Sequence, residues 1–392
     1  MSAVGREPTR ARFDDLSRGT AMVFPPPERV LLARGVEDVV PVLEEVQRAT
    51  AAGQWAHGLL SYEAAPGLDP GLVTAAPDPD GVPLAWFGIS GAPAETEAIS
   101  RSGPSPARVW LPDWTDAEHE AAVAVVHEHI AAGETYQCNL TDRLRTAAVT
   151  DPEELYAHLV TAQLSAYNAH LDIGRFAIVS ASPELFFEWC GDRLRTRPMK
   201  GTAPRGALPD EDELRAATLR ASAKERAENL MIVDLLRNDL GRLARPGSVR
   251  VPTLFQLEGY PTVWQLTSEV TAEVGGDVGL VDVFRALFPC GSVTGAPKPR
   301  TMRLIRDLET TARGVYCGAI GYVAPPDAPV HARFSVAIRT AVVDRETGRA
   351  VYGAGGGITW DSEPASERAE LLTKAAVLGG RPAGREARRT RR

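Results

Sequence analysis

Short apolar runs, broken by proline and glycine, mark the first third of the chain. Three of them, at residues 30–32, 59–62 and 84–89, have the length and composition typical of strands. The spacing of apolar positions predicts a helix near 36–53, between the first two runs. The stretch 91–107 is polar and rich in proline, serine and glycine, which is typical of a surface connection.

The pattern changes near residue 115. Residues 116–132 carry apolar positions at helical spacing and stop at Gly133, so we expect a helix with a glycine cap. A long helical region is predicted over 213–241 and a closing helix over 366–378. Hairpin-like strand pairs and segregated helices indicate an α+β protein with mainly antiparallel sheets rather than a doubly wound fold. The strands are expected at 136–140, 176–180, 247–251, 315–324, 333–343 and 349–354.

Composition excludes several classes of protein. The chain has 392 residues, 44% hydrophobic and 24% charged, which suits one large domain or two modest ones. No apolar run reaches the roughly 18 residues of a membrane span, and the polar N-terminus lacks the apolar segment of a secretory signal. The net charge is −8 and basic residues are scattered apart from 385–392, unlike a nucleic-acid footprint. We therefore expect a soluble, cytoplasmic protein that binds neither nucleic acid nor membranes.

Two further patterns exclude common cofactor sites. The four cysteines lie far apart without C-x-x-C spacing, so neither a disulfide framework nor a structural zinc site is expected, as in a reducing cytoplasm. The glycine-rich stretch 353–357 follows a strand but opens no βαβ unit, so it is not a dinucleotide-binding loop. The cysteines are Cys138, Cys190, Cys290 and Cys317.

Lysine is scarce in this chain. Of 43 basic residues only four are lysines: Lys200, Lys224, Lys298 and Lys374. Arginine stays protonated in proteins, whereas a lysine can become a neutral amine. Each lysine is therefore a candidate for a role that arginine cannot fill, although chance or packing size is the better explanation for any single one. Only the place of each lysine in the sequence and in the fold can show which of them has such a role.

Two pairs of glutamates are spaced by three residues in predicted helices. Glu225 pairs with Glu228, and Glu367 with Glu370. This spacing places each pair on one helix face, where like charges repel unless a cation lies between them. Two such helices facing each other would offer oxygen ligands to a hard ion such as Mg²⁺. Spacing alone still favours ordinary solvated helix faces, because the neighbouring Lys224 and Arg226 can pair with these carboxylates.

A predicted β-hairpin brings a carboxyl group and an amine together. Residues 185–190 and 194–198 flank a turn at 191–192, and Glu184 and Lys200 stand at the two open ends. A surface salt bridge is one interpretation. The other is a general acid beside a nucleophilic or cationic lysine. Gly201 leaves room in the backbone behind Lys200.

Two further segments can hold anions. The loop 289–298 carries Ser292 and Thr294 and leads into a helix near Arg300, so its backbone N–H groups can hold an anionic group. Arg339 is a charge inside an apolar strand, and a buried arginine needs an anionic partner. The sequence alone does not distinguish a substrate carboxylate from a structural acidic side chain as the partner of Arg339.

Taken together, these segments resemble the chorismate-utilising enzymes, a family that includes the large component of anthranilate synthase, aminodeoxychorismate synthase component I, and the isochorismate and salicylate synthases. Residues 58–66 are also similar to short-form aminodeoxychorismate synthases. The matching motifs run in family order over about residues 115–380, at 136–141, 182–184, 198–202, 227–235, 291–298, 313–318, 338–340 and 356–359.

The resemblance implies an architecture. The expected fold is an anthranilate-synthase-like α/β/β/α layered sandwich of largely antiparallel sheets. Residues 1–110 would form an N-terminal α+β region and 111–380 the chorismate-binding catalytic region. Residues 381–392 are expected to be a disordered basic tail.

The resemblance also assigns roles. It implies Mg²⁺ as cofactor, with Glu228 and Glu370 as direct ligands and Glu225 and Glu367 supporting through water, and it implies that the metal grips the ring carboxylate of chorismate. Tyr316 and Arg339 match residues that hold the enolpyruvyl carboxylate. The rest of the expected substrate-binding set is Gly355, Gly356, Gly357, Ser292, Thr294, Gln137, Thr202 and Lys374.

Two positions point to the subfamily. Isochorismate and salicylate synthases carry a lysine base where this chain has Gln137, which disfavours water as nucleophile. Anthranilate synthases have alanine where this chain has Lys200, and aminodeoxychorismate synthases have lysine. The implied mechanism is attack of the neutral Lys200 amine on C2 of chorismate, with Glu184 as the acid for the leaving C4 hydroxyl. Ammonia then displaces the lysine at C4.

Partners and alternatives follow from the same resemblance. The sequence shows no glutamine-hydrolysing portion, so we expect a separate glutamine amidotransferase subunit to supply ammonia for 4-aminobenzoate, folate or a specialised aromatic pathway. The alternatives are anthranilate synthase, another chorismate-aminating enzyme, or a non-catalytic chorismate-binding paralogue. One departure is Gln265, where the family usually has histidine.

Overall fold

Two antiparallel sheets form the centre of the protein. The computed structural model describes residues 10–100, 108–147, 149, 151–260 and 263–378. Within this part of the chain the first sheet has the strand order β16 (Gly295–Ala296), β8 (Gln137–Thr146), β20 (Arg349–Ile358), β19 (Thr340–Asp344), β10 (Phe176–Ser182), β9 (Tyr167–Asp172), β1 (Ala11–Asp15), β2 (Thr20–Phe24) and β6 (Ala94–Glu97), with β7 (Leu111–Pro112) paired to β8.

The second sheet is built in the same way, again from antiparallel pairs only among the described residues. Its strand order is β13 (Met199–Pro204), β15 (Val263–Glu273), β12 (Arg193–Arg197), β11 (Leu185–Cys190), β18 (Ala332–Val336), β17 (Ala319–Val323), β4 (Trp55–Leu60), β5 (Ala85–Ser90) and β3 (Arg29–Ala33), with β14 (Arg250–Gly259) paired to β15.

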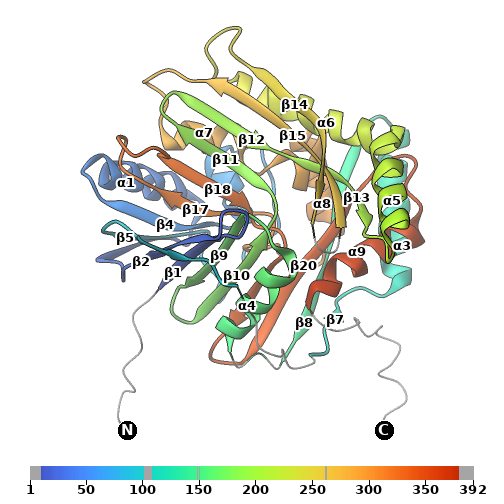
Figure 1. The fold of residues 1–392 in the computed structure, drawn as a ribbon, viewed down its shortest axis with the longest axis horizontal. Coiled ribbons are helices and arrows are strands. Elements are labelled where there is room, and N and C mark those ends of the chain that lie inside the picture. Colours follow the sequence, from blue (N-terminus) through green and yellow to red (C-terminus); the bar gives the residue numbers. More distant parts are fainter. Residues whose placement is uncertain (1–9, 101–107, 148, 150, 261–262, 379–392) are drawn as a thin grey trace.

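Helices cover the outer faces of both sheets (Figure 1). Helix α4 packs on β10 and α9 on β20, whereas α1 packs on β3, β4 and β5 and α6 packs on β15. This arrangement is the expected α/β/β/α sandwich, and the predicted α+β class is confirmed. The helices are α1 (Val39–Ala51), α2 (Ala65–Leu68), α3 (Asp116–Ala131), α4 (Pro152–Gln163), α5 (Pro209–Ala221), α6 (Ala223–Gly241), α7 (Leu280–Leu287), α8 (Lys298–Leu308) and α9 (Pro364–Ala375).

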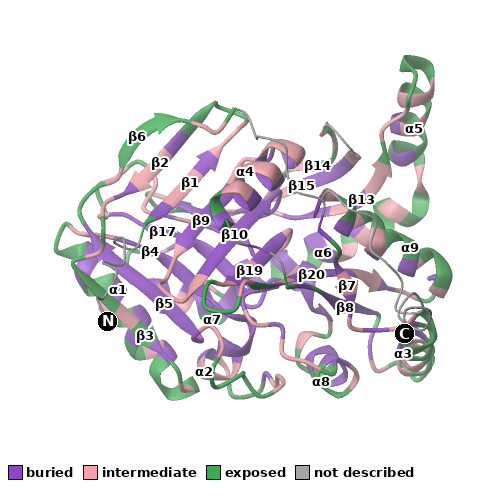
Figure 2. Ribbon diagram, turned by 90° about the horizontal axis from the view of Figure 1, so that it is seen from below, coloured by how far each residue is buried: buried purple, intermediate pink, exposed green. Residues whose placement is uncertain are grey.

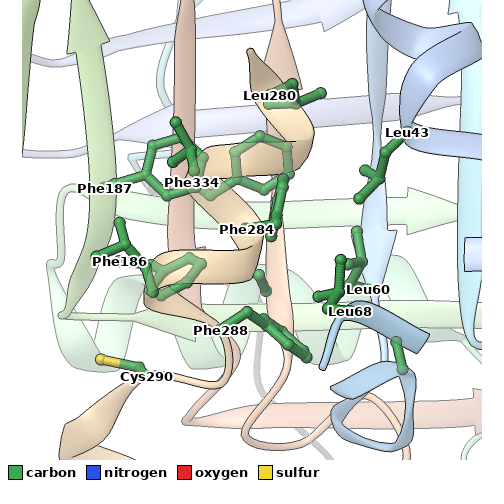
Figure 3. Close-up of a cluster of buried hydrophobic side chains, with 14 of the residues drawn as sticks. Leu43, Leu60, Leu68, Phe186, Phe187, Leu280, Phe284, Phe288, Cys290 and Phe334 are labelled. Carbon is green, nitrogen blue, oxygen red and sulfur yellow. The ribbon is translucent and has the colours of Figure 1, made fainter. Parts of the chain in front are cut away.

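Apolar side chains fill the spaces between these layers. Phe24, Leu59, Ile178 and Ile320 are buried in the cluster between the two sheets. A larger cluster lies between the second sheet and its helices, where rings of α7 meet rings of the strands (Figure 3). There the Phe284 ring centroid lies 5.1 Å from that of Phe334, in an edge-to-face arrangement. Figure 2 shows the same pattern, with buried residues concentrated along the strands and exposed residues on the outer helices.

The first 110 residues extend both sheets. Strands β1, β2 and β6 lie at the end of the first sheet, and β3, β4 and β5 lie at the end of the second. The N-terminal α+β region therefore shares its sheets with the region that follows. The predicted basic tail, 381–392, and part of the predicted connection, 101–107, lie outside the described residues. No helix in the described part of the chain is long and apolar enough to cross a membrane.

Two predicted elements are each divided. The helical region 213–241 is two helices, because Ser222 is extended (ψ 114°) and its side chain accepts a hydrogen bond from Glu225 N (3.3 Å), which caps α6. The strand 333–343 is also two strands in different sheets, since Arg339 has φ +52° and turns the chain from β18 to β19. In both cases the apolar pattern continues across a local break in the backbone, so the sequence alone predicts a single element.

Candidate active site

One cavity, of about 970 Å³ with its open mouth included, collects most of the residues singled out in the sequence. Of the sixteen predicted site residues, fourteen line it: Glu184, Lys200, Thr202, Glu225, Glu228, Ser292, Tyr316, Arg339, Gly355, Gly356, Gly357, Glu367, Glu370 and Lys374. They come from both sheets and from α6 and α9, which lie at the same end of the molecule in both views (Figure 1 and Figure 2).

Lysine scarcity proves informative. Three of the four lysines, Lys200, Lys224 and Lys374, line this cavity. The fourth, Lys298, donates a hydrogen bond to Asp239 (2.9 Å) and another to the carbonyl of Leu287 (3.2 Å). Lys298 therefore has a structural role, while the side chains of the other three face the cavity.

A β-bulge presents Lys200. The pairing of β13 with β15 shifts between Met199, opposite Thr267, and Thr202, opposite Gln265, so Lys200 and Gly201 face a single residue of β15. Gly201 has φ +87°, and a Cβ there would lie 3.1 Å from Glu225 Oε2. The bulge needs glycine at 201, and it places the amine of Lys200 in the cavity.

The backbone of Gly357 lies directly against the amine of Lys200. A Cβ added at Gly357 would lie 2.3 Å from Gln137 Nε2 and 2.8 Å from Lys200 Nζ. We therefore expect Gly357→Ala to displace both side chains and to lower the rate of the reaction in this cavity by roughly 10²-fold, because small misplacements of reacting groups have effects of this size. The control is Gly91→Ala, since a Cβ at Gly91 meets nothing within 4 Å. A Gly357→Ala enzyme with the wild-type rate would contradict this geometry.

Glu184 is a buried carboxyl group next to this lysine. It precedes β11, where Leu185 pairs with Arg197, so the predicted hairpin is confirmed, with Glu184 and Lys200 beyond its open end. Only 2% of Glu184 is exposed. Burial raises the pKa of Glu184 to about 7, against the opposing effects of the Ser292 hydroxyl and the Lys200 ammonium. Such a carboxyl can donate a proton near neutral pH.

This pKa predicts a pH dependence. A general acid acts in its protonated form, so a pKa of about 7 means that the contribution of Glu184 is full below pH 7 and falls as pH rises above it. We expect Glu184→Gln to lower kcat by roughly 10²-fold or more and to remove this descending limb from the pH profile between 6 and 9. A variant that keeps both the rate and the limb would exclude Glu184 as the acid.

Two helices bring four carboxylates to the opposite wall. Glu225 and Glu228 come from α6, Glu367 and Glu370 from α9. Burial, followed by repulsion from Glu228 and Glu370, raises the pKa of Glu225 to about 7. Burial also raises the pKa of Glu367. The fold turns both pairs toward one cavity, an arrangement that spacing alone did not favour, although the Glu370 side chain is still 49% exposed.

These carboxylates are suitable ligands for a hard divalent cation, although the protein side chains alone do not form a complete coordination shell. Among the described residues, no three histidine, cysteine, aspartate or glutamate side chains are arranged to hold a metal ion. Lys374 Nζ lies 2.7 Å from Glu370 Oε1, which lowers the pKa of Glu370, and donates to the carbonyl of Gly355 at 2.8 Å. Mg²⁺ commonly takes only one or two protein carboxylates and completes its shell with water and substrate oxygens, so the donor set fits it.

Arg339 and Tyr316 line the cavity from two connections, Arg339 between β18 and β19 and Tyr316 in the turn before β17. Arg339 Nη1 donates to the carbonyl of Lys374 (2.6 Å), and in the described part of the chain no carboxylate lies within 4 Å of this guanidinium. The structural-acid alternative thus finds no support, and an anionic ligand for Arg339 stays a prediction. The Tyr316 ring packs on Gly353, where a Cβ would lie 2.2 Å from the ring.

The two remaining predicted residues are not among those that line the cavity. Thr294 is buried, and its hydroxyl donates to the carbonyls of Cys290 (3.2 Å) and Gly291 (3.3 Å). Gln137 is fully buried, with its amide on the same side of Gly357 as the Lys200 amine, and neither atom of that amide has a hydrogen-bond partner among the described residues. Both stay predictions as substrate-binding residues.

Sequence reasoning missed several lining residues. Lys224, Asn139 and Tyr352 face the cavity but were not assigned to it. Lys224 carried a signal, since it is one of four lysines, whereas Asn139 and Tyr352 carried none beyond their place in matching or apolar segments. Gln265, noted as a departure from the family, also lines the cavity and donates a long hydrogen bond to Thr202 Oγ1 (3.4 Å).

Comparison with known proteins identifies the family. Residues 28–379 match the sequence model of the chorismate binding enzymes, and the chain belongs to that family. Its fold is similar to that of anthranilate synthase component I from Streptococcus pneumoniae TIGR4, with a TM-score of 0.78, 24% identity, and coverage of 96% of this chain and 94% of the other.

Individual relatives carry two different names. The chain is 42% identical over 270 residues to anthranilate synthase component 1 of Streptomyces coelicolor, covering 69% of this chain and 52% of the relative. It is 38% identical over 291 residues to aminodeoxychorismate synthase component 1 of Klebsiella aerogenes, covering 74% of this chain and 62% of the relative. The match thus spans about half to three fifths of these relatives' length, and it leaves two activities to distinguish.

Proposed function

We propose that this chain is the chorismate-converting component of an aminodeoxychorismate synthase, which makes 4-amino-4-deoxychorismate from chorismate and ammonia. The observation that carries the proposal is the pairing, in one cavity, of the bulge-presented Lys200 amine with the buried carboxyl of Glu184. Relatives named aminodeoxychorismate synthase component 1 support it, as does the resemblance at Lys200 and Gln137.

The cavity walls provide for a substrate with two carboxylates. Arg339 and Tyr316 would hold the enolpyruvyl carboxylate, assisted by the backbone of residues 355–357 and of Ser292. Glu228 and Glu370 would hold Mg²⁺, with Glu225 and Glu367 behind them. A bound Mg²⁺ would neutralise the ring carboxylate, which would otherwise meet four glutamates, and would draw electron density from the ring.

Lys200 and Glu184 perform the chemistry in this proposal. The Lys200 amine attacks C2, the ring double bonds shift, and the C4–O bond breaks, with Glu184 giving its proton to the leaving hydroxyl, which departs as water. Ammonia then attacks C4, the double bonds shift back, and the C2–Nζ bond breaks to release Lys200. The proton that Nζ loses after its attack restores Glu184, and the proton that ammonia loses after its attack goes to the departing Nζ, so the sum is chorismate plus ammonia to aminodeoxychorismate plus water.

Ammonia would come from a partner. The relatives' names denote a first component of a larger enzyme, and we propose a glutamine amidotransferase subunit as the second. The product would feed 4-aminobenzoate and folate synthesis or a specialised aromatic pathway. Anthranilate synthesis is the second candidate, because a relative of that name is 42% identical to this chain.

The experiment is product identification. Purified protein is incubated with chorismate, Mg²⁺ and an ammonium salt, and the products are separated by chromatography against standards. Aminodeoxychorismate as the main product supports the proposal. Anthranilate or isochorismate as the main product refutes the assignment within the family, and unchanged chorismate refutes the activity altogether.

A further inference from the structure

A buried charge network lies behind the cavity, outside the residues that line it. It consists of two carboxylates, Glu63 and Glu309, and two guanidiniums, Arg143 and Arg313, each at most 8% exposed. Four such groups are rarely buried without a specific arrangement, because unpaired buried charges are strongly destabilising. Glu309 receives hydrogen bonds from Arg313 Nη2 (2.7 Å) and Arg143 Nη2 (3.3 Å), whereas Glu63 accepts only backbone N–H groups.

Arg313 connects this network to two segments of the cavity wall. Its Nη2 donates to the carbonyl of Asn139 in β8, and its Nη1 donates to the carbonyl of Val293 in the loop before α8, both at 2.7 Å. Asn139 and Val293 both line the cavity. A single planar guanidinium thus fixes the distance between two segments that are far apart in the sequence.

Glu63 holds the backbone of the same arginine. Its Oε1 accepts from Arg313 N (2.7 Å) and its Oε2 from Gly314 N (2.9 Å), 250 and 251 residues away in the sequence. Tyr316, which faces the cavity, follows two residues later. The Arg143 guanidinium lies over the Tyr316 ring, 5.3 Å from its centroid. Glu63 therefore fixes the turn two residues before Tyr316, and Arg143 lies against the Tyr316 ring.

We propose that Glu63 is a positioning residue for substrate binding, acting through the turn at 313–314 on Tyr316. The inference rests on the proposed function of the cavity, and it gives a role to the N-terminal segment 58–66, which lies outside the cavity itself. Glu63 touches no substrate. Its two accepted hydrogen bonds set where the Tyr316 hydroxyl stands relative to the cavity, so its loss weakens binding in the ground state and the transition state alike.

This role predicts a split between KM and kcat. Glu63→Gln keeps the shape but places an NH₂ group against a backbone N–H, which breaks one of the two hydrogen bonds. We expect KM for chorismate to rise roughly tenfold with kcat nearly unchanged, the signature of lost uniform binding. Glu63→Asp keeps the charge with a shorter reach, so its KM should rise less. If Glu63→Gln does not fold, the KM of Glu63→Asp provides the test instead.

Two controls separate positioning from stability. Glu188 is also a buried glutamate, paired with Arg195 (2.7 Å) and Arg333 (2.6 Å) away from the cavity, so Glu188→Gln should lower Tm but leave KM unchanged. In a double-mutant cycle with Tyr316→Phe, the combined rise in KM should be no larger than that of the worse single variant. The idea is overturned if Glu63→Gln lowers only Tm, if Tyr316→Phe leaves KM unchanged, or if the two effects multiply. A wild-type protein that does not convert chorismate would instead refute the proposed function.

Discussion

A Lys200→Ala enzyme is expected to form aminodeoxychorismate at least 10³-fold more slowly than the wild-type enzyme, a loss typical of removing a catalytic nucleophile. The bulge in β13 and the φ of Gly201 direct this side chain into the cavity, beside Glu184. Alanine removes the amine without adding bulk, so the walls of the cavity should stay in place. Rates are measured with chorismate, Mg²⁺ and saturating ammonium.

The matched control for this variant is Lys298→Ala. Lys298 is also partly buried, but it pairs with Asp239 away from the cavity, so its loss should lower Tm while the rate per folded molecule stays close to wild type. A Lys200→Ala enzyme that makes aminodeoxychorismate at the native rate would exclude the covalent route. A residual rate reduced only a few-fold would instead assign Lys200 an electrostatic role.

The second large effect concerns the metal. Five carboxylates and four cationic side chains line the cavity, so a substrate carrying two carboxylates enters a site with no surplus of positive charge. We expect a chelator to abolish conversion and Mg²⁺ to restore it. In Glu228→Gln and Glu370→Gln, the Mg²⁺ concentration that gives half of the maximal rate should rise by roughly 10²-fold, because each loses a proposed ligand.

Asp234→Asn provides the control on the same helix. Asp234 pairs with Arg237 at the surface of α6 (2.8 Å) and should have no effect on the Mg²⁺ requirement. Direct titration of Mg²⁺ by calorimetry, with and without chorismate, separates lost metal binding from lost catalysis. Full activity of chelator-treated protein would show that no metal ion is required and that the lysine ammonium groups alone compensate the negative charge of the glutamates.

The parts of the site that could be predicted are those with a local signal. Lys200 and Glu184 were found because a hairpin is a short-range structure, and because lysine is so rare in this chain that each one stands out. The glutamate pairs were recognised as pairs, but their spacing favoured solvent-facing helices. What reversed that interpretation is the packing of α6 and α9 around one cavity, which no local pattern encodes.

Other features depend on contacts that sequence patterns do not show. The strand predicted over 333–343 continues through Arg339 as an apolar pattern, yet the backbone turns there into the other sheet. The hydrogen bonds of Glu63 join residues 250 positions apart. Segment 58–66 was noted only for its resemblance to other enzymes, and its contact with the turn before Tyr316 became evident only in the folded chain.

Addition of nitrogen at C4 of chorismate, with Lys200 as the nucleophile, can be followed with labelled ammonia. The most direct measurement supplies ¹⁵N-ammonium to the purified protein with chorismate and Mg²⁺ and locates the label by NMR. We predict ¹⁵N bonded to C4 of a product that retains the enolpyruvyl group, in the wild-type enzyme but not in Lys200→Ala. Label on C2, or in anthranilate, would contradict the account.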